Sequence, residues 1–221
     1  AMLADLARAQ PADLAVLREL AWARLYQADL AVWQDQRASE GARLLAGVEP
    51  LAARIRSDDP QWRALERFRR AVRMDVLGWM ERYGEEIALA EDSLAWLARH
   101  PPAERVTPAF AIARADALTS RAEGLFYTGR AQASLADAEA ADAVLAAALA
   151  RYPDHPALLS ARVVSLYNLI TTLEPLGHRE GLLAKAEELS GIARRSRTFE
   201  PNDRLIAWRA RNADALLAQL L

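Results

Sequence analysis

A leucine–alanine–arginine triplet followed closely by a proline occurs three times in the chain. The three copies are Leu6-Ala7-Arg8 before Pro11, Leu97-Ala98-Arg99 before Pro101, and Leu149-Ala150-Arg151 before Pro153. Recurrence at intervals of tens of residues is typical of repeat proteins, in which each unit packs mainly on its neighbours. Because proline cannot continue a helix, each copy marks the end of one helix and the start of another. The recurrence therefore predicts an array of antiparallel helices.

The composition favours helix along the whole chain. Apolar residues make up 52% of the sequence and are mostly Ala and Leu, and only 9 of 221 residues are Gly. β-Branched residues are sparse, so strong helix formers fill nearly every stretch. We therefore predict an all-α fold.

The turn prolines divide this single predicted repeat domain, residues 1–221, into units. Prolines 11, 60, 101, 153 and 201 lie 49, 41, 52 and 48 residues apart, so the predicted repeats are 41–52 residues long. The predicted units are a truncated repeat at 1–10, four repeats at 11–59, 60–100, 101–152 and 153–200, and a capping helix at 201–221. Because the first unit is too short for a complete repeat, we expect the chain to be a fragment of a longer protein.

Each repeat is expected to hold two helices with a turn between them. Capping residues predict three starts of first helices, at Asp13, at Asp58-Asp59-Pro60 and at Thr107-Pro108. Glycines predict three of the turns: Gly84 as the residue just past a helix end, the segment from Gly124 to Gly129, and Gly177-His178. Return helices are predicted at 42–56, with a kink or break at Pro50, at 131–150, and at 180–195 before an insertion at 196–200.

The order of small and large residues along the first helices resembles the tetratricopeptide-like (TPR) helical repeat family. Tyr26 and Tyr167 match the aromatic residue of that family's first helix, whereas Ala23 and Val164 replace its glycine, and its early tryptophan is missing from most units. The resemblance covers almost the whole chain, although these repeats are longer than the standard unit of about 34 residues. It implies a right-handed α-helical solenoid of antiparallel helix pairs, similar to the arrays attached to bacterial serine/threonine kinases and multidomain regulators. HEAT-like pairs of about 40–47 residues are the alternative.

Charge and motif content argue against several classes of function. The net charge is −2 and the chain has no Cys, so neither general attraction to nucleic acid nor a thiolate metal site is expected. No apolar run approaches the roughly 18 residues that span a bilayer, and no phosphate-binding, dinucleotide or hydrolase motif is present. We therefore expect no enzyme activity, cofactor, metal or membrane insertion. The expected location is the cytoplasm, or the periplasm if the parent protein carries a membrane anchor.

Four arginines on the first helix of the second repeat form the main candidate binding site. They are Arg63, Arg67, Arg70 and Arg73. The spacing places the first three in one stripe of a helix. The family resemblance implies that first helices line a concave groove, where guanidinium groups could clamp an acidic peptide. The alternative is an exposed face whose arginines pair with Glu66 and nearby acids.

Three aromatic residues of the first repeat form a second candidate site. Trp22, Tyr26 and Trp33 are 4 and 7 residues apart and share one face of the predicted helix. Their simplest role is packing between repeats. If preceding repeats are absent, part of this face would be exposed and could form a homodimer.

The sequence therefore predicts a scaffold that binds a protein or peptide segment, acidic if the arginine stripe is its site. The first alternative is a ligand-sensing or peptide-sensing regulatory domain of a bacterial kinase or transcriptional regulator. A helical enzyme is the second alternative.

Overall fold

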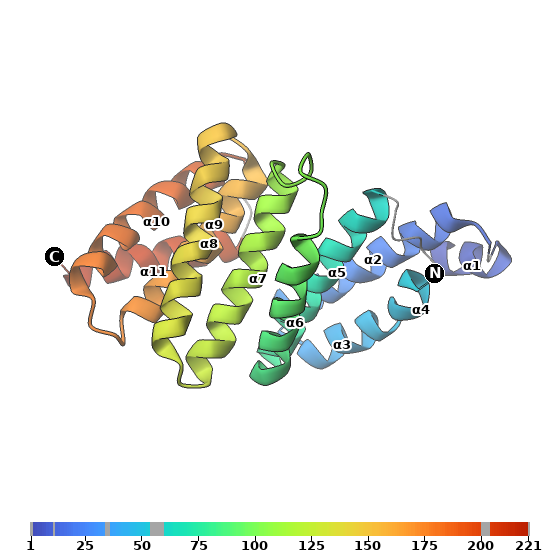
Figure 1. Cartoon of the computed structure of the whole chain (residues 1–221), viewed down its shortest axis with the longest axis horizontal. Coiled ribbons are helices and arrows are strands. Elements are labelled where there is room, and N and C mark those ends of the chain that lie inside the picture. The colour runs from blue at the N-terminus through green and yellow to red at the C-terminus, as the bar shows by residue number, and fades with distance from the viewer. Residues whose placement is uncertain (1, 11, 34–35, 54–59, 200–203, 221) are drawn as a thin grey trace. The chain divides into compact units, whose positions relative to one another are not determined.

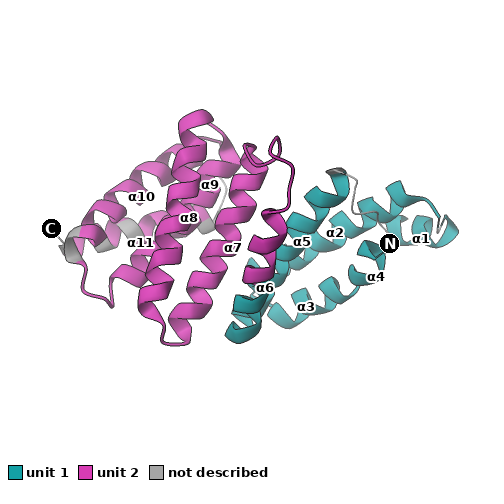
Figure 2. Ribbon diagram, in the orientation of Figure 1, with its two compact units in different colours: residues 1–89 teal, residues 90–221 magenta. Residues whose placement is uncertain are grey.

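A computed structural model describes residues 2–10, 12–33, 36–53, 60–199 and 204–220 (Figure 1). Every regular element in these ranges is helical, which confirms the all-α prediction. The chain divides into two compact units, Ala1–Leu89 and Ala90–Leu221 (Figure 2).

Unit 1 is organised around helix α2, Leu14–Trp33. The other helices that lie wholly within it are α1 (Met2–Ala9), α3 (Ala38–Ala46), α4 (Glu49–Ala52) and α5 (Pro60–Trp79). Helix α2 packs against all four of them, and α3 also packs against α5. The side chains of Leu17, Leu25 and Val32 are almost completely buried, so this face of α2 forms the core of the unit.

A proline divides the return helix of the first repeat. Helix α3 ends at Ala46, and α4 begins at Glu49 with Pro50 in its first turn, where a missing backbone N–H costs nothing. This confirms the predicted break at Pro50. The return helix nevertheless starts four residues earlier than predicted, at Ala38, and residues 54–56 lie outside the described residues.

Helices of 17–21 residues build unit 2. They are α7 (Pro108–Tyr127), α8 (Ala131–Arg151), α9 (Pro156–Leu173), α10 (Arg179–Phe199) and α11 (Arg204–Leu220), and α6 (Tyr83–Leu97) contains the boundary between the units. Helix α7 packs against α8 and α9, and α9 packs against α8, α10 and α11. From α7 onwards each helix therefore contacts the next one along the chain, and α9 also contacts both α7 and α11.

Two predicted helix caps are present. The Asp13 carboxylate accepts hydrogen bonds from the backbone N–H groups of Ala15 and Val16, at 2.9 and 3.2 Å. Thr107 accepts one from the N–H of Phe110 at 3.3 Å, with Pro108 as the first residue of α7. Both side chains satisfy backbone donors that have no partner inside the helix. The predicted cap at 58–59 lies outside the described residues.

One turn geometry closes three of the hairpins. A residue two to four positions past the end of α5, α7 and α9 has a positive φ, 57° at Glu81, 80° at Gly129 and 73° at Gly177. The following N–H donates to a carbonyl five residues back, as from Arg82 to Leu77 at 2.9 Å and from Arg130 to Leu125 at 2.8 Å. This is the Schellman arrangement, which satisfies the last carbonyls of a helix.

Two glycine-based predictions about these turns are wrong. Gly84 is not a C′ residue, because it lies inside α6, and Glu81 occupies the left-handed position instead. Gly124 does not loosen a turn, because α7 continues to Tyr127 and buries Gly124. The predicted insertion at 196–200 is also wrong for residues 196–199, since α10 runs on to Phe199 and Ser196 is only 1% exposed. The predicted turn at Gly177-His178 is confirmed.

Helix α9 is long and apolar enough to cross a membrane by length and composition alone. Polar residues such as Arg162 and Asn168 interrupt its apolar sequence. Half of the helix is buried inside unit 2, where Leu159, Val163 and Leu166 are fully covered. A helix at the centre of a protein core meets the same test.

Candidate functional site

The three aromatic residues of α2 divide between two clusters. Trp22 and Tyr26 stack on each other with ring centroids 5.8 Å apart, and both contact Phe68 of α5, at 5.4 and 5.0 Å. Trp33 lies farther along α2, contacts Trp79 of α5 edge-on at 5.9 Å, and donates a hydrogen bond from Nε1 to Asp75 at 3.0 Å. The three residues thus share a helix face, as predicted, but they do not form one cluster.

These contacts show that α2 and α5 run in the same direction. Trp22 meets Phe68 and Trp33 meets Trp79, which is an offset of 46 residues in both cases. Two first helices therefore lie side by side. Tyr26 remains 56% exposed and Trp79 43% exposed, so the face combines aromatic packing with exposed aromatic area.

Unit 2 repeats this arrangement between α9 and α11. Tyr167 contacts Trp208 with ring centroids 5.3 Å apart, and Trp208 is 44% exposed. Tyr167 and Trp208 are 41 residues apart, and Tyr26 and Phe68 are 42 apart. Both units therefore place a partly exposed aromatic pair between neighbouring first helices.

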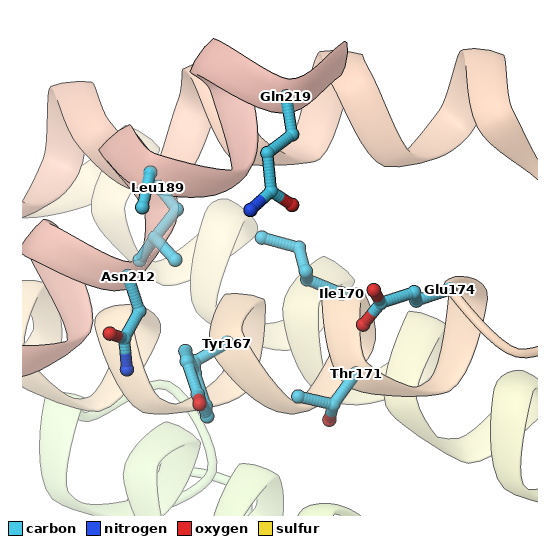
Figure 3. A pocket seen from close by; sticks show the side chains of 8 residues that line it. Tyr167, Ile170, Thr171, Glu174, Leu189, Asn212 and Gln219 are labelled. Atoms are coloured by element: carbon cyan, nitrogen blue, oxygen red, sulfur yellow. The ribbon is translucent and has the colours of Figure 1, made fainter.

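A pocket of about 210 Å³ lies next to the aromatic pair of unit 2 (Figure 3). Eight residues line it: Tyr167, Ile170 and Thr171 of α9 with its C-cap Glu174, Leu189 of α10, and Asn212, Ala215 and Gln219 of α11. We call it the α9–α11 pocket. Its three α9 residues and Glu174 follow one face of that helix, at spacings of three or four residues. The pocket therefore belongs to the same surface as Tyr167 and Trp208.

The α9–α11 pocket combines an apolar floor with polar groups. In Figure 3 the amide of Gln219 points from α11 towards Ile170, the amide of Asn212 lies on the Tyr167 side, and the Glu174 carboxylate turns towards Ile170. Glu174 is the one charged residue of the lining, and none of the described side chains forms an ion pair with it. An open pocket of this composition can bind a polar or cationic group that carries an apolar stem.

Two charged groups lie behind the aromatic pair. The Arg209 guanidinium is 5.9 Å from the centre of the Tyr167 ring, and the residue is only 4% exposed. Burial raises the pKa of the Glu123 carboxyl on α7, and the positive charge of Arg209 partly opposes this shift. When it is ionised, the Glu123 carboxylate therefore balances part of the positive charge of Arg209 from inside the protein.

Part of the predicted arginine site is already paired with a carboxylate of the same helix. Arg70 Nε donates to the nearly buried Glu66 at 2.7 Å, and Arg69 donates to the same carboxylate at 2.7 Å. The hydrogen bond with Glu66 raises the pKa of Arg69 despite its burial. Arg63 and Arg67 are half-buried, whereas Arg73 is exposed. The stripe thus includes a structural ion pair at Arg70, as the alternative interpretation proposed, and its binding role stays a prediction.

The sequence analysis did not identify the α9–α11 pocket. Its residues come from three helices and form no motif, and amide and hydroxyl side chains on helices usually signify exposure. One signal did exist, because the match between Tyr26 and Tyr167 marked equivalent positions in two repeats. Among the described residues, no group of three or more His, Asp or Glu side chains is arranged to hold a metal ion.

Comparison with known proteins adds no identification. No protein-family model matches the chain, and no curated protein or solved structure matches it. The described residues therefore define an all-α protein.

Proposed function

We propose that the chain is a TPR-like helical-repeat module that binds a protein segment across the surface of its first helices. The observation that carries the proposal is the recurrence of a partly exposed aromatic pair between neighbouring first helices in both units. Large aromatic side chains provide much contact area with little conformational freedom, and they dominate many protein interfaces. A core would cover such rings completely, whereas Tyr26, Trp79 and Trp208 keep 43–56% of their area exposed.

The packing order supports the same proposal. In a right-handed solenoid of antiparallel pairs, each first helix contacts its return helix and the next first helix. Helices α7, α8 and α9 have these contacts, and so do α9, α10 and α11. The same Schellman turn follows α5, α7 and α9, so these three helices end in the same way.

Selection of peptides tests this function. Random twelve-residue peptides displayed on phage would be selected against the full chain, and the enriched peptides would be synthesised and titrated. We expect Tyr26→Ser or Tyr167→Ser to weaken binding about tenfold, since loss of a central aromatic contact costs at least 1–2 kcal/mol.

Tyr152 supplies the matched control. It is 39% exposed and lies in the turn between α8 and α9, outside the first helices. Tyr152→Ser should leave the titrations unchanged. Failure to enrich any peptide, or equal losses in all three variants, would contradict the proposed function.

A further inference from the structure

The α9–α11 pocket has a shape that restricts its occupant. Its volume of about 210 Å³ is below the range of about 300–1,000 Å³ that is usual for small-molecule sites. Ala215 is exposed, Ile170 is 4% exposed and Leu189 is fully buried behind them, and Glu174, Thr171 and Gln219 are exposed. The pocket therefore suits a single side chain entering from solvent better than a whole metabolite.

The directions of α9 and α11 determine the sign of the electrostatic potential at one end of the pocket. Helices α9 and α11 run parallel, because Tyr167 and Asn212 lie towards one end of the pocket while Glu174 and Gln219 lie towards the other (Figure 3). Their C-terminal ends therefore lie at the same end, and the peptide dipoles of both helices place partial negative charge there.

No described side chain neutralises that end. Glu174 caps the C-terminus of α9, and neither α9 nor α11 has a basic residue in its last turn. Arg209 lies beyond the opposite end of the pocket, next to Tyr167. A carboxylate without an ion pair and two helix C-termini together favour a cation.

We propose that the α9–α11 pocket binds a lysine or arginine side chain of a peptide that lies across the first helices. The charged group contacts the Glu174 carboxylate, and the methylene stem packs on Ala215 and on the exposed edge of Ile170. The amides of Asn212 and Gln219 lie beside the entering chain and can bond peptide backbone groups. This assignment rests on the proposed function and gives its partner a basic residue.

Three short peptides provide the test. They are acetylated and amidated pentapeptides of glycine and alanine that carry a central lysine, glutamine or glutamate. Each would be titrated into the ¹⁵N-labelled full chain while backbone amide shifts are followed. The lysine peptide should shift the amides of Thr171, Glu174 and Gln219 and bind at least threefold more tightly than the other two.

A pair of glutamate variants separates the site from general charge. Glu174→Gln should weaken binding of the lysine peptide about two- to fivefold, as expected for one solvent-accessible ion pair. Glu187→Gln, an exposed position of α10 outside the pocket, should not change it. Loss of the lysine preference at 0.5 M salt would agree with a charge interaction.

Several results would overturn the inference. Equal binding of all three peptides, shifts confined to other helices, or an unaltered titration in Glu174→Gln would each do so. Putrescine binding at the pocket as tightly as the lysine peptide would remove the assignment to a peptide. If phage selection still enriched peptides that depend on Tyr26 or Tyr167, the proposed function would survive any of these results.

Discussion

Lys185, the only lysine of the chain, donates a hydrogen bond from α10 to Asp142 of α8 at 2.6 Å. Arg162 of α9 binds the other oxygen of Asp142 at 2.9 Å, and both cations also bind Glu188. Burial lowers the pKa of Lys185, but its hydrogen bonds with Asp142 and Glu188 outweigh this effect and raise the pKa overall. One carboxylate with an 8% exposed side chain thus joins three helices of unit 2.

Lys185→Met should destabilise unit 2 by about 1–2 kcal/mol, because Asp142 loses one of its two charged partners while part of the site remains hydrated. Arg162→Met should cost more, about 3 kcal/mol, since this arginine is less exposed than Lys185. Urea unfolding followed by circular dichroism would measure both losses, and Lys185→Arg should recover at least half of the stability that Lys185→Met loses. Additive losses in the double variant would contradict a shared network.

Arg70 and Arg73 provide a matched test of the arginine stripe. Arg70→Met should destabilise the chain by about 1 kcal/mol, because the nearly buried Glu66 loses one of its guanidinium partners. Arg73→Met, at an exposed position, should change stability by less than about 0.5 kcal/mol. Thermal unfolding of the two variants would measure the difference. Equal effects would mean that the Arg70 ion pair adds no stability.

In the turn between α5 and α6, the left-handed position is held by Glu81, whereas Gly84 lies within a helix. Glu81→Gly should stabilise the chain by about 0.5–1 kcal/mol, because glycine adopts a positive φ without the steric cost of a Cβ. Gly84→Ala should be neutral or stabilising by up to about 1 kcal/mol, since Gly84 lies within α6 and a Cβ there meets no atom. Chemical denaturation would compare the variants. Destabilisation by Gly84→Ala would restore Gly84 as the turn residue.

Glu123 should make stability depend on pH. Burial raises its pKa in the folded state, so the folded chain takes up a proton at a higher pH than the unfolded chain does. Stability from this group therefore increases as pH falls from above the raised folded pKa to the ordinary value of 4.5. Glu123→Gln should be more stable than the parent at neutral pH, and this advantage should disappear below about pH 4.5. Unfolding free energies measured from pH 4 to pH 8 would show it. A difference that is constant with pH would exclude this effect of Glu123.

Helix class and helix starts were predictable because their signals are local. Asp13 and Thr107 bond backbone groups within three residues, so their roles can be recognised without any tertiary structure. The turn at Glu81 was not predicted, because Glu81 has a positive φ, a conformation that glycine usually adopts at the end of a helix. The end of α10 was missed because Ser196 and Thr198 resemble a loop, although Ser196 is buried by the fold.

The candidate site was predictable only in part. The repeat match between Tyr26 and Tyr167 placed aromatic residues at equivalent positions, but it did not provide their partners Phe68 and Trp208. Those contacts join residues 41 and 42 positions apart, so they depend on how neighbouring helices pack. The Arg70 to Glu66 pair differs, because its residues are four positions apart on one helix and the alternative interpretation of the arginine stripe included it.

The turns after α5 and α7 are too short to take up an inserted residue without changing the orientation of the next helix. Residues 80–82 and 128–130 are all that separate the paired helices, and one added residue would rotate the next helix by about 100°. An insertion after Gly129 would turn Asp137 away from Arg121, which it now binds at 2.6 Å. The same insertion after Pro102 would enter the connection at 98–107 and leave both flanking helices in phase. Insertions and deletions should therefore accumulate at that open connection, while each hairpin is gained or lost as a whole.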